Sequence, residues 1–185
     1  MPELRQRGSY HGACDNDIHT RWAEALKHVN VYTDGACLGN PGPGGYGVIL
    51  EHNDAEKELS AGFRLTTNNR MELLATIVAL EALKEPCEVD LYSDSQYVVY
   101  GIEKGWARAW RAKGWRKRDG QMAINPDLWS RLLDQIDRHS VRFHWVRGHA
   151  GHPENERVDR LAFAAAQQPD LPPDEGYEQS VTSNK

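Results

Sequence analysis

Long apolar runs are missing from this sequence of 185 residues. No stretch approaches the ~20 consecutive apolar residues that a membrane-spanning helix needs, and the polar N-terminal segment lacks an apolar stretch of the signal-peptide kind. Cysteine is also scarce. Cys14, Cys37 and Cys87 are odd in number and widely spaced, which argues against a disulfide framework. We therefore expect a protein of the reducing cytoplasm, with no membrane association.

Acidic residues are absent from residues 104–118, although the whole chain has a net charge of −5. Local charge matters more than the sum when a polyanion docks. In this basic segment, Trp106, Trp110 and Trp115 alternate with seven cations: Lys104, Arg108, Arg111, Lys113, Arg116, Lys117 and Arg118. The pattern predicts a platform for a sugar-phosphate backbone. The alternative is a helix whose tryptophans anchor it to the core while its charges face water.

Proline and charge divide the chain into three parts. Residues 1–27 are polar without a strong period, so we expect a poorly ordered or helical appendage. Residues 168–185 combine three prolines with acidic residues, which predicts a flexible tail. The folded domain is expected at 28–167. No long exposed apolar face demands a partner, so we expect a monomer.

The hydrophobic periodicity of this domain predicts an α/β fold. Strands are expected at 29–33, 46–50, 58–65, 89–93 and 141–146. Helices are expected at 70–83, after Ser95, at 107–113, 126–138 and 154–167. The glycine-rich residues 39–47 lack the Gly-Lys-Ser/Thr ending of a phosphate loop and are interpreted as a tight connection between strands. Three consecutive strands followed by β-α alternation indicate a five-stranded mixed sheet flanked by helices.

Two aspartates follow apolar strands. Asp34 ends the first predicted strand and Asp94 follows the fourth. Ligands of α/β sheets gather at the carboxyl ends of strands, which favours a functional role for both residues. The structural alternatives are an Asp-Gly turn at Asp34 and a helix cap at Asp94.

Two more carboxylates lie on predicted helices. Glu72 stands three residues after Asn69, so a capping box is its structural alternative. Asp159 lies near the apolar face of the last helix, with no basic residue three or four positions away. A buried carboxylate without a partner is costly, and a cation would remove that cost. If these four acids meet, they suit two Mg²⁺ ions, which prefer oxygen ligands; Mn²⁺ is a possible substitute.

His149 lies in a glycine-bearing loop after the last strand. Next to a metal cluster, its imidazole could transfer protons or help product leave. A surface histidine is the alternative. Zinc binding by His149 and His152 is disfavoured, because no cysteine pair or third ligand has zinc-like spacing.

Four motifs resemble those of bacterial type 1 ribonuclease H. They are YTDGACLGNPGPGGYG from Tyr32, TTNNRMEL from Thr66, SDSQYV from Ser93 and WVRGHAGHPENERVD from Trp145. They occur in order within 28–167. The resemblance implies a ribonuclease H-like fold and an endonuclease that cuts the RNA strand of RNA/DNA hybrids, leaving 5′-phosphate and 3′-hydroxyl ends.

The resemblance also implies roles for individual residues. Metal ligation falls on Asp34, Glu72, Asp94 and Asp159, and His149 is the catalytic residue of the mobile loop. Contacts with the hybrid are implied for Cys37, Asn40, Asn68, Asn69 and Gln96, and the basic segment would grip the DNA strand through Trp106, Trp110, Lys113, Arg116 and Lys117. The N-terminal extension lies outside the resemblance.

Two other functions stay open from sequence alone. One is a non-catalytic hybrid-binding module, which the complete acidic set argues against. The other is a different nuclease or strand-transferase of the same fold, such as an integrase relative, which the basic segment and the asparagine-rich loop disfavour. Cleavage of hybrid, duplex DNA and duplex RNA would separate them.

Overall fold

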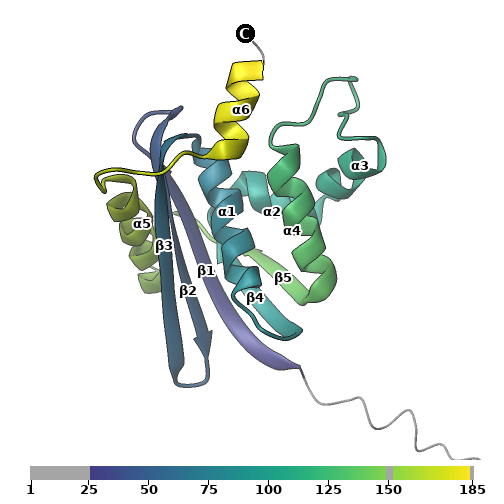
Figure 1. Cartoon of the computed structure of the whole chain (residues 1–185). Helices are drawn as coiled ribbons and strands as arrows, with labels where there is room; N and C mark the ends of the chain where they lie inside the picture. Colours follow the sequence, from purple (N-terminus) through teal and green to yellow (C-terminus); the bar gives the residue numbers. More distant parts are fainter. Residues whose placement is uncertain (1–25, 149–151, 184–185) are drawn as a thin grey trace, which may run out of the picture.

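The computed structural model describes residues 26–148 and 152–183, and its centre is one mixed sheet (Figure 1). The strand order is β3-β2-β1-β4-β5, with β1–β2 and β2–β3 antiparallel and β1–β4 and β4–β5 parallel. The strands are β1 (Lys27–Cys37), β2 (Gly42–His52), β3 (Ala55–Thr66), β4 (Cys87–Ser93) and β5 (Ser140–Trp145). The five-stranded mixed sheet predicted from the sequence is confirmed.

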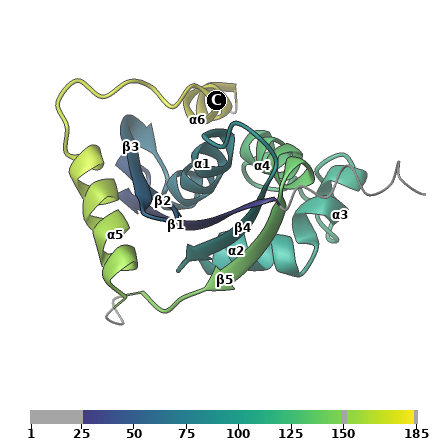
Figure 2. The same ribbon diagram turned by 90° about the horizontal axis from the view of Figure 1, so that it is seen from below.

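Helices cover both faces of this sheet. Those between residues 68 and 166 are α1 (Asn68–Glu81), α2 (Gln96–Glu103), α3 (Trp106–Ala112), α4 (Pro126–Arg138) and α5 (Pro153–Ala166). Figure 2 shows α1 and α5 on opposite sides of the sheet. The buried core lies mainly on the α1 side, where α1 packs against β1 and β2 and α4 packs against α1 and β5, around side chains such as Met71, Ile77 and Trp129.

Strand β2 begins earlier than the sequence indicates. Residues 39–47 were expected to form a connection, but Gly42, Gly44, Gly45 and Gly47 belong to β2. The reason is close packing by α5: a Cβ added to Gly45 would lie 2.5 Å from the carbonyl oxygen of Ala162. Because Gly45 and Gly47 have no side chains, α5 packs directly against β2.

The C-terminal segment differs from the expected flexible tail. Residues 168–174 cross the end of β3 and lead into α6 (Glu175–Ser183), as Figure 1 shows. Asp174 is buried, and the backbone N–H of Arg64 donates to the carbonyl of Pro172 at 2.9 Å. The proline and acid content that predicts disorder is outweighed by these tertiary contacts. The appendage expected at the N-terminus lies almost wholly outside the described residues.

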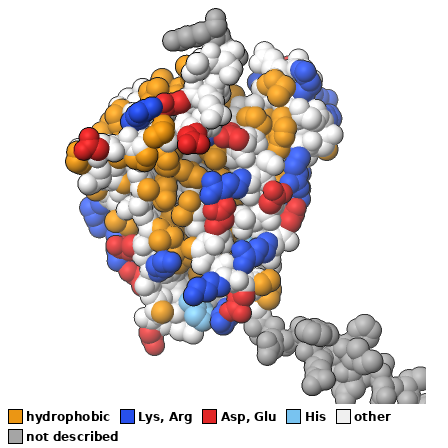
Figure 3. Space-filling model, in the orientation of Figure 1, with side chains coloured by type: hydrophobic (Ala, Val, Ile, Leu, Met, Phe, Trp, Pro, Cys, Tyr) orange, Lys and Arg blue, Asp and Glu red, His pale blue; other side chains and the backbone are white. Residues whose placement is uncertain are grey.

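Figure 3 shows hydrophobic side chains gathered over the middle of one face of the molecule. A groove of about 500 Å³ is lined there by Tyr46, Phe63, Leu74 and Val78, with other residues of α4 and the C-terminal segment. None of the four predicted carboxylates lines this groove. Within the described ranges, no helix combines the length and apolarity needed to cross a membrane.

Candidate active site

Asp34 lies inside β1, because the strand continues to Cys37. The Asp-Gly turn is therefore wrong as an explanation of this residue. Asp34 pairs with Gly47 of β2. The next residue, Gly35, meets α1: a Cβ added there would lie 2.4 Å from the backbone nitrogen of Glu72. Since successive residues of a strand point to opposite faces, the Asp34 side chain lies on the face away from α1.

Asp94 directly follows β4, beside Asp34. The parallel register aligns Thr33 with Ser93, so Asp34 and Asp94 occupy equivalent positions on neighbouring strands. Asp94 does not cap α2; the cap is Ser95, whose hydroxyl oxygen accepts from the N–H of Val98 at 3.3 Å. A Cβ added to Gly148 would lie 2.6 Å from an Asp94 carboxylate oxygen, so the turn after β5 covers Asp94.

Glu72 is not part of a capping box. Helix α1 begins at Asn68, and its N-cap, Thr67, makes no side-chain capping bond. The Glu72 carboxylate instead accepts from the Asn68 amide at 2.7 Å and from the Ser95 hydroxyl. Ser95 therefore joins α1 to α2 beside Asp94.

Asp159 reaches the same region from α5. The residue before it, Val158, packs against β2: a Cβ added to Gly47 would lie 2.3 Å from the Val158 carbonyl oxygen. Gly47 is the register partner of Asp34. The glycines of β2 thus bring α5, and with it Asp159, to the face of the sheet that carries Asp34. We call Asp34, Glu72, Asp94 and Asp159 the carboxylate set.

The charges of the carboxylate set interact. Burial, followed by the negative charge of Asp94, raises the pKa of Asp34 to about 8, with smaller contributions from Asp159 and Glu72. The N–H of Gly35 donates to Asp34 at 2.7 Å and opposes this rise. Burial also raises the pKa of Glu72 to about 7, against the hydrogen bond from Ser95. Two carboxyl groups with raised pKa values, Asp34 and Glu72, next to other acids from separate parts of the chain, are typical of functional sites.

The chemistry of this donor set fits Mg²⁺ or Mn²⁺. All donors are carboxylate oxygens, and a cation would favour the ionised forms that burial and mutual repulsion disfavour. Across residues 26–148 and 152–183, no three histidine, cysteine or acidic side chains are already arranged to hold a metal ion.

Polar residues predicted to contact the hybrid gather around the start of α1. The backbone N–H of Asn68 donates to the Asn40 side-chain oxygen at 3.3 Å. The Cys37 thiol lies 3.5 Å from the carbonyl oxygen of Gly42 at the base of the same loop. Asn69 and Gln96 are exposed, each next to a residue that bonds Glu72. His149 lies outside the described residues, so neither its predicted catalytic role nor zinc binding with His152 is tested.

The basic segment forms a cavity of about 610 Å³ lined by the predicted contacts and two neighbours: Trp106, Ala109, Trp110, Lys113, Arg116, Lys117 and Arg118. Trp106 is 43 % exposed, whereas Trp110 packs edge-on against the buried Trp129, with ring centroids 5.9 Å apart. Trp110 therefore anchors α3 as well as lining the cavity. The structural alternative therefore holds for Trp110, and the binding role of the exposed Trp106 stays a prediction.

Not every cation of the basic segment faces outward for a ligand. Arg108 and Arg111 form ion pairs with Asp134 and Asp137 of α4. The Lys104 ammonium lies over the Tyr100 ring, 4.1 Å from its centroid. The positive charge at the cavity therefore comes from the lysines and arginines of residues 113–118.

Sequence reasoning missed Ser95 and the Arg70–Asp174 ion pair. A serine between a strand and a helix is an N-cap signal that could have identified Ser95. Arg70 and Asp174 are separated by 104 positions, and their pairing has no local signal.

Comparison with known proteins finds the same family by a family model and by individual relatives. The family model of RNase H matches residues 26–167. Ribonuclease H of Desulforamulus reducens is 67 % identical over 157 residues, covering 85 % of this chain and 99 % of that protein. Ribonuclease H of Syntrophus aciditrophicus is 61 % identical over 151 residues, covering 82 % and 87 %.

Solved structures agree. LC9-RNase H1, described as a type 1 RNase H with the type 2 active-site motif, superposes with a TM-score of 0.69 at 35 % identity, covering 76 % of this chain and 72 % of that one. RNase H1 of the halophilic archaeon Halobacterium salinarum gives a TM-score of 0.57 at 28 % identity, covering 75 % and 96 %.

Proposed function

This chain belongs to the ribonuclease H family, whose members hydrolyse the RNA strand of RNA/DNA hybrids, and we propose that its carboxylate set carries out this reaction. The observation that supports the assignment is the electrostatic coupling of the buried Asp34 to the other three acids. The reaction is an endonucleolytic cut with water as nucleophile, leaving 5′-phosphate and 3′-hydroxyl ends.

The carboxylate set would hold two Mg²⁺ ions, with Mn²⁺ as an alternative. Bound metal supplies an activated water and neutralises charge on the scissile phosphate and the leaving 3′-oxygen. Asp34 of β1 and Asp94, the residue after β4, each follow the aligned pair Thr33 and Ser93, and would present oxygens from this edge of the sheet. Glu72, oriented by Asn68 and Ser95, closes the site from α1, and Asp159 closes it from α5.

The hybrid would lie across the polar residues at the start of α1. Amide groups of Asn40, Asn68, Asn69 and Gln96 can donate to and accept from the RNA 2′-hydroxyl, the group that distinguishes RNA from DNA. Cys37 lies at the base of the loop between β1 and β2, which carries Asn40, and its contact with Gly42 contributes to the shape of that loop. The DNA strand would be held through its phosphates by Lys113, Arg116 and Lys117, with Trp106 as an exposed aromatic surface.

His149 is assigned the proton-transfer or product-release role from the family resemblance, since it lies outside the described residues. Gly148, the residue before it in sequence, lies against the Asp94 carboxylate. A cytoplasmic, monomeric enzyme belongs to the same proposal, and light scattering after size-exclusion chromatography tests the monomer.

The deciding experiment compares Asp34→Asn with the native chain on a labelled RNA/DNA hybrid, duplex RNA and duplex DNA. We expect the native chain to cut only the hybrid, in the presence of Mg²⁺ and not with a chelator. Asp34→Asn should abolish cleavage and keep hybrid binding. Asp54→Asn, an exposed acid in the β2–β3 turn, is the matched control and should cut normally. Retained cleavage by Asp34→Asn would overturn the assignment.

A further inference from the structure

The C-terminal strap, residues 168–183, lies outside the part of the chain that matches the family model. It is nevertheless tied to the structure at several points. Its backbone bonds β3 through Arg64 and Pro172. The Arg64 guanidinium forms a two-pronged ion pair with Glu178 at 2.9 and 2.8 Å. The hydroxyl of Thr66, the last residue of β3, donates to the Asp174 carboxylate at 2.7 Å.

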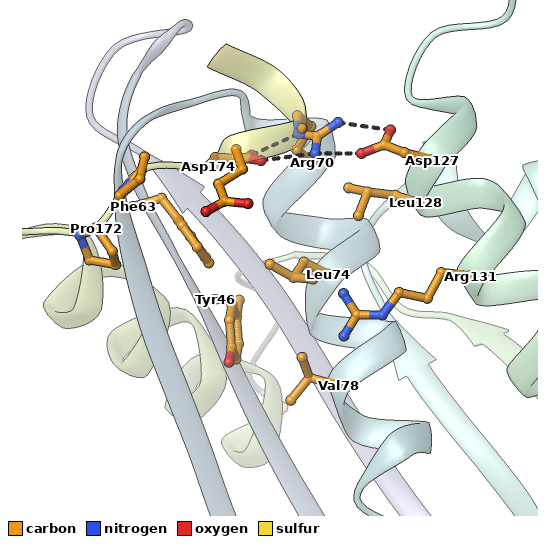
Figure 4. Close-up of a pocket in the computed structure, with 13 residues that line it drawn as sticks. Tyr46, Phe63, Arg70, Leu74, Val78, Asp127, Leu128, Arg131, Pro172 and Asp174 are labelled. Atoms are coloured by element: carbon orange, nitrogen blue, oxygen red, sulfur yellow. Dashed lines mark hydrogen bonds and ion pairs between the residues drawn. The ribbon is translucent and has the colours of Figure 1, made fainter. Parts of the chain in front are cut away.

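The strap reaches α1 through Arg70. In Figure 4 the Arg70 side chain lies between Asp174 and Asp127, with dashed lines to both. Arg70 donates to the two Asp174 oxygens at 2.7 and 2.9 Å and to the two Asp127 oxygens at 3.1 and 2.8 Å. One guanidinium thus joins α1, α4 and the strap by paired hydrogen bonds, the strongest geometry available to arginine.

Arg70 depends on these partners. Its side chain is only 5 % exposed, and a buried cation without paired acids is strongly destabilising. It also sits in the first turn of α1, where the helix dipole disfavours positive charge. Burial opposes its charge, but the hydrogen bonds and negative charges of Asp127 and Asp174 outweigh burial and raise the pKa of Arg70.

The first turn of α1 lacks the usual local supports of a helix start. Its N-cap, Thr67, makes no side-chain hydrogen bond, and no acidic residue lies in the turn. Capping bonds and acidic side chains are the usual local supports of a helix start. This turn carries Asn68 and leads directly to Glu72, which Asn68 contacts. The clamp at Arg70 therefore adds a tertiary support, two residues before Glu72, to the hydrogen bonds from Asn68 and Ser95 that orient the Glu72 carboxylate.

We propose that Asp174 is a positioning residue for hydrolysis: through Arg70, the C-terminal strap holds the first turn of α1 where Glu72 can complete the carboxylate set. This inference rests on the proposed function of Glu72. It predicts that the strap, although it lies outside the four motifs, contributes to cation binding and not only to folding stability.

The test is Asp174→Asn, with Mn²⁺ binding followed by the electron paramagnetic resonance signal of free Mn²⁺ and with cleavage followed over a Mg²⁺ titration. We expect Mn²⁺ affinity to fall about tenfold, the lower end of the effect of changing groups that orient metal ligands. The Mg²⁺ concentration for half-maximal cleavage should rise by a similar factor. Glu178→Gln, which removes only the exposed strap ion pair with Arg64, should leave both quantities unchanged.

Val89→Ala is the control for loss of stability alone, because Val89 is a buried residue of β4 whose register partners are Val29 and Val141. It should lower the melting temperature without changing Mn²⁺ affinity. If Asp174→Asn does not fold, Asp127→Asn removes the more exposed acid of the clamp and should shift Mn²⁺ affinity in the same direction. A lower melting temperature with unchanged Mn²⁺ affinity in Asp174→Asn would overturn the inference while leaving the native chain's cleavage, and hence the proposed function, intact.

Discussion

Replacing Asp34 by asparagine should stabilise the protein in a chelating buffer, although it abolishes cleavage. The pKa of Asp34 is raised to about 8 in the folded state, from an ordinary value of 3.8. The folded protein therefore holds a proton that the unfolded chain releases between these two values. The stability linked to Asp34 is complete below pH 4 and is lost as the pH rises through 8.

The size of the effect follows from the separation between pH and the unfolded pKa. Each unit corresponds to about 1.4 kcal/mol, so Asp34 reduces the free energy of unfolding by at most about 4 kcal/mol at pH 7 and about 1 kcal/mol at pH 4.5. Asparagine has nearly the same shape and no ionisable proton. Asp34→Asn should therefore be more stable than the native chain by these amounts, with the larger gain at pH 7.

Urea unfolding of both proteins with a chelator at pH 4.5 and pH 7 measures this difference. Mg²⁺ should raise the stability of the native chain at pH 7 and have little effect on Asp34→Asn, because a ligand stabilises only the state that binds it. Asp54→Asn is the control for a change of charge alone. Equal stability of Asp34→Asn and the native chain at both pH values would refute the burial and repulsion inferred for Asp34.

Three further changes test other parts of the structure. Ser95→Ala removes the hydroxyl that donates to Glu72 and should reduce the cleavage rate about tenfold or more. Ser95→Thr keeps a hydroxyl and should retain most activity. Equal cleavage rates for the two variants would contradict an orienting role of Ser95. Gly47→Ala places a Cβ against the carbonyl of Val158 and should lower the free energy of unfolding by about 1–3 kcal/mol in urea titrations. An unchanged free energy of unfolding would mean that α5 does not pack on β2 at this position. Lys113→Ala should weaken hybrid binding and reduce the slope of log affinity against log salt by about 1. Arg108→Ala should change this slope less, because Arg108 is already paired with α4. A larger change for Arg108→Ala than for Lys113→Ala would place the DNA strand on α3 instead.

Local patterns predicted most of the secondary structure. The apolar period of α1 predicted a helix at 70–83, and the structure has it at Asn68–Glu81. The helix expected at 126–138 matches α4 (Pro126–Arg138). Such signals are readable because the side chains that define them are neighbours on one helix face. Element ends were less accurate, most clearly at β2, where glycines typical of a turn extend a strand.

The sequence predicted that the four acids would come together, but not their physical state. Each of the four acids had a local structural alternative, and three of these failed for a tertiary reason: β1 continues past Asp34, Ser95 caps α2 in place of Asp94, and Glu72 bonds Ser95 instead of closing a capping box. The raised pKa of Asp34 depends on burial and on charges from other elements. No local pattern contains that information.

The sequence by itself determined the order of elements, the family and the acids proposed to hold metal, because these depend on side-chain chemistry and short-range periodicity. Only the tertiary structure decided which glycines seat α5, which hydroxyl holds Glu72, and that the C-terminal strap is ordered. Asp174 binds Arg70 from 104 positions away in the sequence. A buried cation needs an acidic partner, and which distant acid pairs with it is determined by the packing of the whole chain, not by any local segment.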